Sequence, residues 1–166
     1  LSSNAAHKII ETKSTSFSCD LLKWLEIMQT YENGGHAYHA TMPTDAIKHF
    51  RDTINETAKF GFDNAFNKQH ELGNRVRNLL KKYKIKSVAE EGFHAPSVVV
   101  SYTSDKDIHN GLKFKAIGMQ IAAGVPLNCD ESDEYQTFRL GLFGLDKLKD
   151  IDSCLARLDE SLKRIF

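Results

Sequence analysis

The middle of the sequence carries one long apolar stripe, and this stripe restricts the possible folds more than any other feature. Between residues 43 and 83 apolar side chains recur at intervals of three, four or seven positions. The positions are Ile47, Phe50, Ile54, Ala58, Ala65, Leu72, Val76, Leu79 and Tyr83. Proline is tolerated in the first turn of a helix, so Pro43 marks a start. The stripe predicts one long helix whose weakest points are Gly61 and Gly73, each costing about 1 kcal/mol relative to alanine.

After this helix the apolar period changes from helical to alternating. We expect strands at 85–88, 97–103, 121–127 and 136–143, and helices over 106–119 and 147–165. The order of these elements predicts an α+β fold. The expected architecture is a small, mostly antiparallel sheet with helices on one face, preceded by the long linking helix.

The first 42 residues form a separate, smaller part of the chain. Residues 18–31 have helical spacing around Trp24, with Ser18 as a candidate N-cap, and 32–35 predict a loop. No run of apolar positions in 1–42 is long enough to form a core. We therefore expect 1–42 to pack against another domain and 43–166 to form a domain of its own.

Charge and cysteine content exclude several classes of partner. Lysine plus arginine and aspartate plus glutamate number 22 each, so neither nucleic acid nor an anionic membrane is expected as a partner. Apolar runs are too short to span a bilayer, and we expect no signal peptide. The cysteines, Cys19, Cys129 and Cys154, form no C-x-x-C pair. Their odd number favours reduced thiols and a cytoplasmic location.

Arg139 is the most informative single residue. It lies in the middle of an expected strand, and alternation places it opposite the apolar face of Phe138 and Leu140. Its neighbours on that face are Thr137 and Gly141, and Gly141 has no side chain to fill the space beside the guanidinium. The planar donors of arginine match a carboxylate, so Arg139 is a candidate carboxylate-binding residue. The alternative is an edge-strand arginine in a surface ion pair.

The segment 38–41 directly precedes the long helix. The hydroxyls of Tyr38 and Thr41, together with the backbone N–H groups at a helix N-terminus, could bind a phosphate. Ordinary helix capping by Thr41 is the alternative interpretation.

Two further groups of residues are candidates for a reactive site. His36 and His39 have H-x-x-H spacing and His49 follows, but no Cys or Asp ligand completes a zinc set, so no metal is expected. Cys129 could serve as a mobile nucleophile. Its acidic neighbours, Asp130, Glu131 and Asp133, should raise its pKa and disfavour the thiolate.

Three segments resemble the class V aminotransferases of the alanine–glyoxylate and serine–pyruvate type. Residues 38–43, Tyr-His-Ala-Thr-Met-Pro, resemble the family's Y-H-x-T-x-P stretch. Residues 138–144, Phe-Arg-Leu-Gly-Leu-Phe-Gly, resemble its F-R-[IL]-G-x-x-G strand. Between them, 123–127 correspond to a glycine-containing loop.

The resemblance implies the C-terminal domain of a fold type I enzyme that uses pyridoxal 5'-phosphate (PLP). Such an enzyme moves an amino group between a small amino acid, alanine or serine, and a 2-oxo acid, glyoxylate or pyruvate. By this resemblance Arg139 binds the substrate carboxylate. Tyr38 and Thr41 reach the PLP phosphate of the other subunit of a homodimer, and 1–42 is an arm of a large PLP domain missing from the chain.

One departure from the family concerns the Schiff-base lysine. The family places it upstream of the Y-H-x-T stretch in a small-residue setting, which neither Lys8 nor Lys13 has. We therefore expect no catalytic residue in this chain, and an isolated chain that is inactive.

Two alternative functions remain open. One is a cysteine desulfurase-like enzyme of the same class, with Cys129 as the nucleophile. The other is a non-catalytic α+β module that binds a small ligand or a partner protein.

Overall fold

A computed structural model describes residues 2–41, 43–132 and 134–166. The chain divides into two compact units, residues 1–52 and 53–166. Helix α3 (Thr44–Phe60) runs across the boundary between them. The assignment of 1–42 to a missing large domain stays a prediction.

The first unit contains two short helices before α3. They are α1 (Ser3–Glu11), which the sequence did not predict, and α2 (Leu21–Glu32). The N-cap of α2 is Asp20, whose carboxylate accepts a hydrogen bond from the backbone N–H of Lys23, and not the expected Ser18. The Ser18 carbonyl instead accepts a hydrogen bond from the indole of Trp24. In the described helices of this unit, Ile27 is the buried residue.

The long linking helix is interrupted. In its place the structure has α3 and α4 (Phe62–Lys82), joined at Gly61 with a φ of +92°. That backbone conformation is accessible to glycine and strained for other residues, so the chain can turn there without losing its apolar period.

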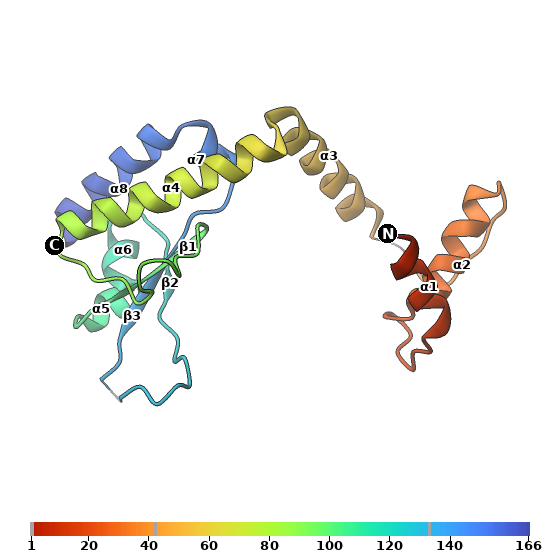
Figure 1. Ribbon diagram of the computed structural model, residues 1–166, viewed down its shortest axis with the longest axis horizontal. Coiled ribbons are helices and arrows are strands. Elements are labelled where there is room, and N and C mark those ends of the chain that lie inside the picture. Colours follow the sequence, from red (N-terminus) through yellow and green to blue (C-terminus); the bar gives the residue numbers. More distant parts are fainter. Residues whose placement is uncertain (1, 42, 133) are drawn as a thin grey trace. The chain divides into compact units, whose positions relative to one another are not determined.

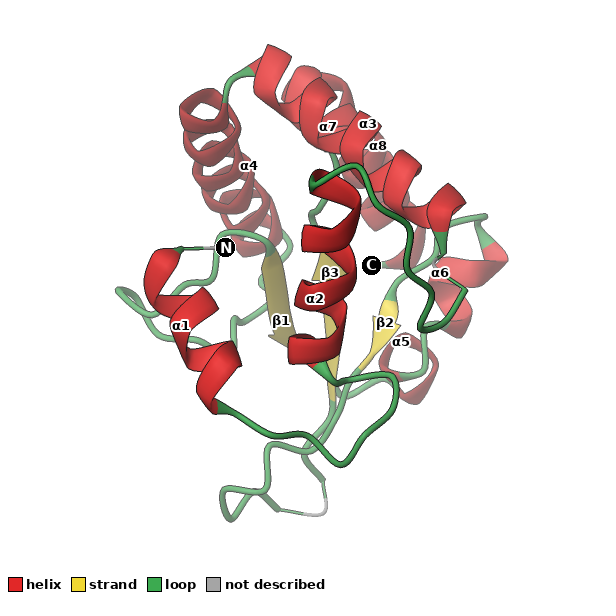
Figure 2. Cartoon of the chain, turned by 90° about the vertical axis from the view of Figure 1, so that its right-hand side faces the viewer, coloured by secondary structure: helices red, strands yellow, loops and turns green. Residues whose placement is uncertain are grey.

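The second unit is built around a three-stranded antiparallel sheet (Figure 2). Its strands are β1 (Val98–Tyr102), β2 (Ala122–Ala123) and β3 (Thr137–Gly141), in the order β1-β3-β2. The expected strand 121–127 is therefore reduced to two residues. The expected strand 85–88 is reduced to one bridge, between Ser87 and Ser101.

Helices cover one face of this sheet, as predicted. Helix α4 lies against β1 and beside α8 (Ile151–Ile165) (Figure 1). Short helices α5 (Lys106–His109), α6 (Leu112–Ala116) and α7 (Leu145–Lys149) complete the layer. The expected helix 106–119 is divided at Gly111, whose φ is +77°, and the expected helix 147–165 is preceded by α7 and a separate cap at Asp150. The α+β class is thus confirmed.

The core lies between the helices and the sheet. The predicted apolar face of Phe138, Leu140 and Leu142 is buried there. Each such side chain contributes roughly 1.5–3 kcal/mol when fully buried. Helical residues of the same core are Leu72, Val76, Leu79, Leu80, Ile108, Phe114, Leu148, Ile151, Leu158 and Leu162.

Gly73 explains how closely α4 approaches the residues before β1. A Cβ atom at Gly73 would lie 2.6 Å from the carbonyl oxygen of Pro96. The Gln69 side-chain amide, one turn earlier, donates to the same oxygen at 3.0 Å. Gly73 therefore does not interrupt the helix; it allows α4 to pack directly on the backbone near Pro96.

Candidate functional site

Arg139 lies on the central strand of the sheet. It pairs with Val100 of β1 on one side and with Ala122 of β2 on the other. Its side chain shares a sheet face with these two partners and with Val98, Tyr102, Thr137 and Gly141, a set that we call the Arg139 face. Thr137 is its buried member, at 1% exposure, and the others are half-buried or exposed. The alternation predicted from the sequence is thus present, but the strand is central and not an edge.

The guanidinium group of Arg139 is held at one point and otherwise free. Its Nε–H donates to the carbonyl oxygen of Ala123 at 2.9 Å. Within the part of the chain that the structure describes, no carboxylate forms an ion pair with it and its terminal nitrogens have no partner. The surface ion pair considered above is therefore absent from the described residues.

The backbone around Arg139 is fixed by close contacts that the sequence motif did not reveal. A Cβ atom at Gly124 would lie 2.2 Å from the carbonyl oxygen of Thr137, so only glycine allows this segment to cross β3. That oxygen also receives a hydrogen bond from Nδ1 of His109 at 2.8 Å. These contacts hold β2, and with it the Ala123 carbonyl, beside Arg139. The presence of Gly124 in 123–127 was the available signal in the sequence.

Tyr38 and Thr41 belong to the first unit. Their hydroxyl oxygens lie 3.3 Å apart within hydrogen-bonding distance, and both side chains are exposed just before α3. Met42, between them and the helix, lies outside the described residues. The structure thus brings these two predicted site residues together.

The fold matches part of a known aminotransferase structure. The chain superimposes on a crystal structure of alanine–glyoxylate aminotransferase from Nostoc sp. with a TM-score of 0.71 and 16% sequence identity. The match covers 98% of this chain and 42% of the Nostoc chain, so this chain spans less than half of that protein's length. At this identity the similarity concerns the fold.

The other two comparisons found no relative. No protein-family model matches the sequence, and no curated protein matches it. In the described part of the chain, no helix is both long enough and apolar enough to cross a membrane.

The residues of this chain fit one part of PLP and not another. The paired hydroxyls of Tyr38 and Thr41, followed by the N-terminus of a 17-residue helix, suit the phosphate group. Neither upstream lysine, Lys8 or Lys13, lies in a setting suited to form a Schiff base with the PLP aldehyde. Lys8 is exposed, and its Nζ lies 3.5 Å from Oε2 of Glu11; Lys13 is also exposed. An activated lysine instead needs a desolvated setting or a neighbouring cation.

Two of the three histidines named for zinc, His36 and His39, contact aromatic rings. The His39 ring lies 4.3 Å from that of Phe17, and its Nε2 is 3.0 Å from the Phe17 carbonyl oxygen. The His36 ring packs edge-on against Tyr31. Within the described residues, no group of three or more His, Cys, Asp or Glu side chains is placed to hold a metal ion.

Cys129 lies in a loop organised by Glu131. The Glu131 carboxylate accepts hydrogen bonds from the backbone N–H groups of Leu127, Asn128 and Cys129, which lower its pKa to about 2. Partial desolvation, with the negative charge of Glu131, raises the pKa of the Cys129 thiol. The direction agrees with the prediction, although Asp133 lies outside the described residues. The shift disfavours the thiolate that a desulfurase requires.

Proposed function

We propose that this chain is the substrate-recognising C-terminal domain of a PLP-dependent transaminase. The reaction would move an amino group between a small amino acid, alanine or serine, and a 2-oxo acid, glyoxylate or pyruvate. The observation that carries the proposal is the unpaired guanidinium of Arg139 on the central strand. The fold similarity to an enzyme named alanine–glyoxylate aminotransferase supports it.

Arg139 would bind the α-carboxylate of the substrate. Its terminal nitrogens have no partner among the described residues, so two parallel N–H···O bonds can form to the two carboxylate oxygens. The space above Gly141, the next residue on the same face of the strand, is open, since a Cβ there would meet only one atom within 4 Å, Cδ2 of Phe143 at 3.9 Å. The strand would fix the direction from which the substrate approaches.

Tyr38 and Thr41 would donate hydrogen bonds to the PLP phosphate of the partner subunit in a homodimer. PLP, when bound, supplies an electron sink for the amino-group chemistry. The lysine for that chemistry would come from the large PLP domain, to which 1–42 would belong as an arm. We place the enzyme in the cytoplasm because its three cysteines are free.

The carboxylate role can be tested by kinetics on the enzyme in which this chain is joined to its lysine-bearing domain. Arg139→Ala should raise the KM for the amino donor by about 10- to 100-fold, because a charge-assisted bidentate pair is lost. Arg139→Lys keeps the charge but not the planar pair of donors, so its KM should lie between those of the unmodified enzyme and Arg139→Ala.

Arg164→Ala is a matched control, because it removes an exposed arginine at the end of α8. Its KM should equal that of the unmodified enzyme. Unchanged donor affinity in Arg139→Ala would overturn the assignment.

A further inference from the structure

A second basic site lies on the helix-covered side of the sheet. A cavity of about 510 Å³ opens between the C-terminal half of α4, the segment 84–87 and β1. Val99 and Ser101 of β1 line it, and alternation places these two on the face opposite Arg139's partner Val100. The cavity is therefore separated from the Arg139 face by the sheet itself.

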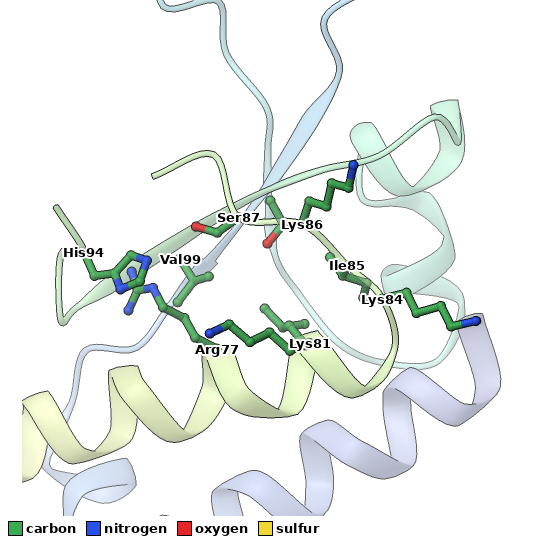
Figure 3. Close-up of a pocket in the computed structure, with 10 residues that line it drawn as sticks. Arg77, Lys81, Lys84, Ile85, Lys86, Ser87, His94 and Val99 are labelled. Atoms are coloured by element: carbon green, nitrogen blue, oxygen red, sulfur yellow. The ribbon is translucent and has the colours of Figure 1, made fainter. Parts of the chain in front are cut away.

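The cavity is rimmed by lysine and arginine side chains. Its lining includes the cations Arg77, Lys81, Lys84 and Lys86, the imidazole of His94, and no Asp or Glu side chain of the described residues. Figure 3 shows the Lys81 side chain extending toward Arg77 and His94, whereas the amines of Lys84 and Lys86 point away. None of these cations forms an ion pair with a described carboxylate. Arg77 and Lys81 thus bring positive charge to this cavity, and no described carboxylate there compensates it.

Arg77 is the unusual member of the group, because it is 6% exposed. Its terminal nitrogens donate to the carbonyl oxygens of Gly73, Ala95 and Val98. These bonds satisfy donors but leave the charge unbalanced, and burial lowers the pKa of the guanidinium. A buried charge without a counter-charge is unfavourable, so a bound anion would stabilise this site.

Two buried donors in the lining have no partner among the described residues. They are the Nε–H of Arg77 and the hydroxyl of Ser101, which is 1% exposed. Buried polar groups are nearly always hydrogen-bonded, so two unsatisfied donors in residues that line one cavity favour a ligand with acceptor atoms. Both atoms are closed to solvent, so a ligand would reach them only after a small shift of the surrounding side chains. The rest of the lining includes the apolar side chains of Leu80, Ile85 and Val99.

We propose that this cavity binds a small organic monocarboxylate with a short apolar body. Its carboxylate would offset the buried charge of Arg77 and accept a hydrogen bond from the Arg77 Nε–H or the Ser101 hydroxyl, and Lys81 adds a flexible cation at the rim. Its apolar body lies on Leu80, Ile85 and Val99. The cavity volume falls within the range of about 300–1,000 Å³ that is usual for small-molecule sites. This site is independent of the role of Arg139.

Hexanoate titrated into the 166-residue chain, followed by calorimetry and by NMR shifts of the residues around Arg77, tests the proposal. Hexanoate should bind, while hexanol, which lacks the charge, and inorganic phosphate, which lacks the apolar body, should bind at least about tenfold more weakly. Undetectable hexanoate binding, or equal binding of hexanol or phosphate, would overturn it.

Two variants separate ligand binding from a purely structural role. Ser101→Ala should weaken hexanoate binding by roughly tenfold while the unfolding midpoint stays the same or rises, because the hydroxyl is unsatisfied without ligand. Lys81→Ala, at an exposed position, should weaken binding by about three- to tenfold.

Lys82→Ala is the matched control, since it removes the same charge from the same helix end but does not line the cavity. It should bind hexanoate like the unmodified chain. Equal weakening by Lys81→Ala and Lys82→Ala would show a diffuse charge effect and overturn the site, as would unaltered binding in Ser101→Ala.

Discussion

At the scale of single residues, the sheet separates two arginines with opposite surroundings. Arg77 is buried and its terminal nitrogens are occupied by three carbonyl oxygens. Arg139 is half-buried and uses only Nε, toward Ala123. Both lack a described counter-ion. In the described part of the chain, Arg77 has only its Nε–H without a partner, whereas Arg139 has its two terminal nitrogens without one. Arg77 can therefore donate one further hydrogen bond, and Arg139 can bind both oxygens of a carboxylate.

Glu131 gives a pH dependence at this scale. Its folded pKa of about 2 lies below the ordinary value of 4.5. The carboxylate therefore stabilises the loop fully at any pH above 4.5. The stabilisation is lost as the pH falls through about 2. Amide exchange of Asn128 and Cys129 can be measured by NMR from about pH 5 to about pH 2, a range that spans both pKa values. Toward the acid end it should accelerate relative to the intrinsic exchange rate of an unstructured amide.

Glu131→Gln provides the control for that measurement. Its neutral side chain can still accept hydrogen bonds but cannot titrate, so the extra acceleration should disappear. The same extra acceleration in both proteins would show that Glu131 is not its cause.

Side-chain alternation found Arg139 because period two is a local property of the strand. The motif also named Tyr38 and Thr41, whose hydroxyls do meet. The Ala123 carbonyl and His109, which hold the strand beside Arg139, could not be found in this way. Their contacts with Arg139 and Thr137 depend on the tertiary path of the chain.

At the scale of elements, apolar periodicity located the long helices, and of their interruptions the sequence marked only Gly61 as a weak point. A single glycine such as Gly61 or Gly111 barely disturbs a pattern of threes and fours, yet its positive φ ends the helix. Residues 121–127 and 85–88 have strand-like composition, but neighbouring strands pair with only a few of them. Pairing partners, which composition does not encode, set the lengths of these strands.

The packing of α4 near Pro96 gives a prediction at the same scale. Gly73→Ala should gain about 1 kcal/mol of helix propensity but lose roughly 2–3 kcal/mol to the clash with the Pro96 carbonyl. The net loss in the free energy of unfolding, measured with urea, should be about 1–2 kcal/mol.

Asn74→Ala is the neighbouring control, at an exposed position of the same helix. It should be neutral or slightly stabilising. If Gly73→Ala were as stable as Asn74→Ala, α4 would not require the close approach.

At the scale of the whole molecule, the residues proposed to bind substrate and cofactor lie in both units, and neither Lys8 nor Lys13 lies in a setting that activates its amine. The Tyr38–Thr41 pair belongs to the first unit and Arg139 to the second. The sequence predicted the α+β class and the helix-covered sheet, because both follow from the order of periodic segments. It did not predict α1, a nine-residue helix whose few apolar positions, Ala5, Ala6, Ile9 and Ile10, span less than two turns.

Addition of PLP to the purified chain should give no stoichiometric lysine adduct. Lys8 and Lys13 are both exposed, and an activated lysine needs a different setting. Borohydride trapping followed by mass spectrometry should therefore find only scattered, substoichiometric labelling.

The double variant Lys8→Arg, Lys13→Arg should show the same background as the unmodified chain. Stoichiometric labelling at either lysine would contradict the assignment of the reactive lysine to another domain. Amino-acid binding without PLP would favour the non-catalytic module instead.

The hydrogen bond from Arg139 Nε to Ala123 has an entropic consequence for ligand binding. A free arginine side chain samples many rotamers, and ordering it at a binding site costs about 0.5–1.5 kcal/mol. Here the bond restricts the side chain before any ligand arrives, and it does so with a nitrogen that bidentate binding through the terminal nitrogens leaves unused. The site is thus preorganised, and more of the interaction energy with a carboxylate remains available as affinity.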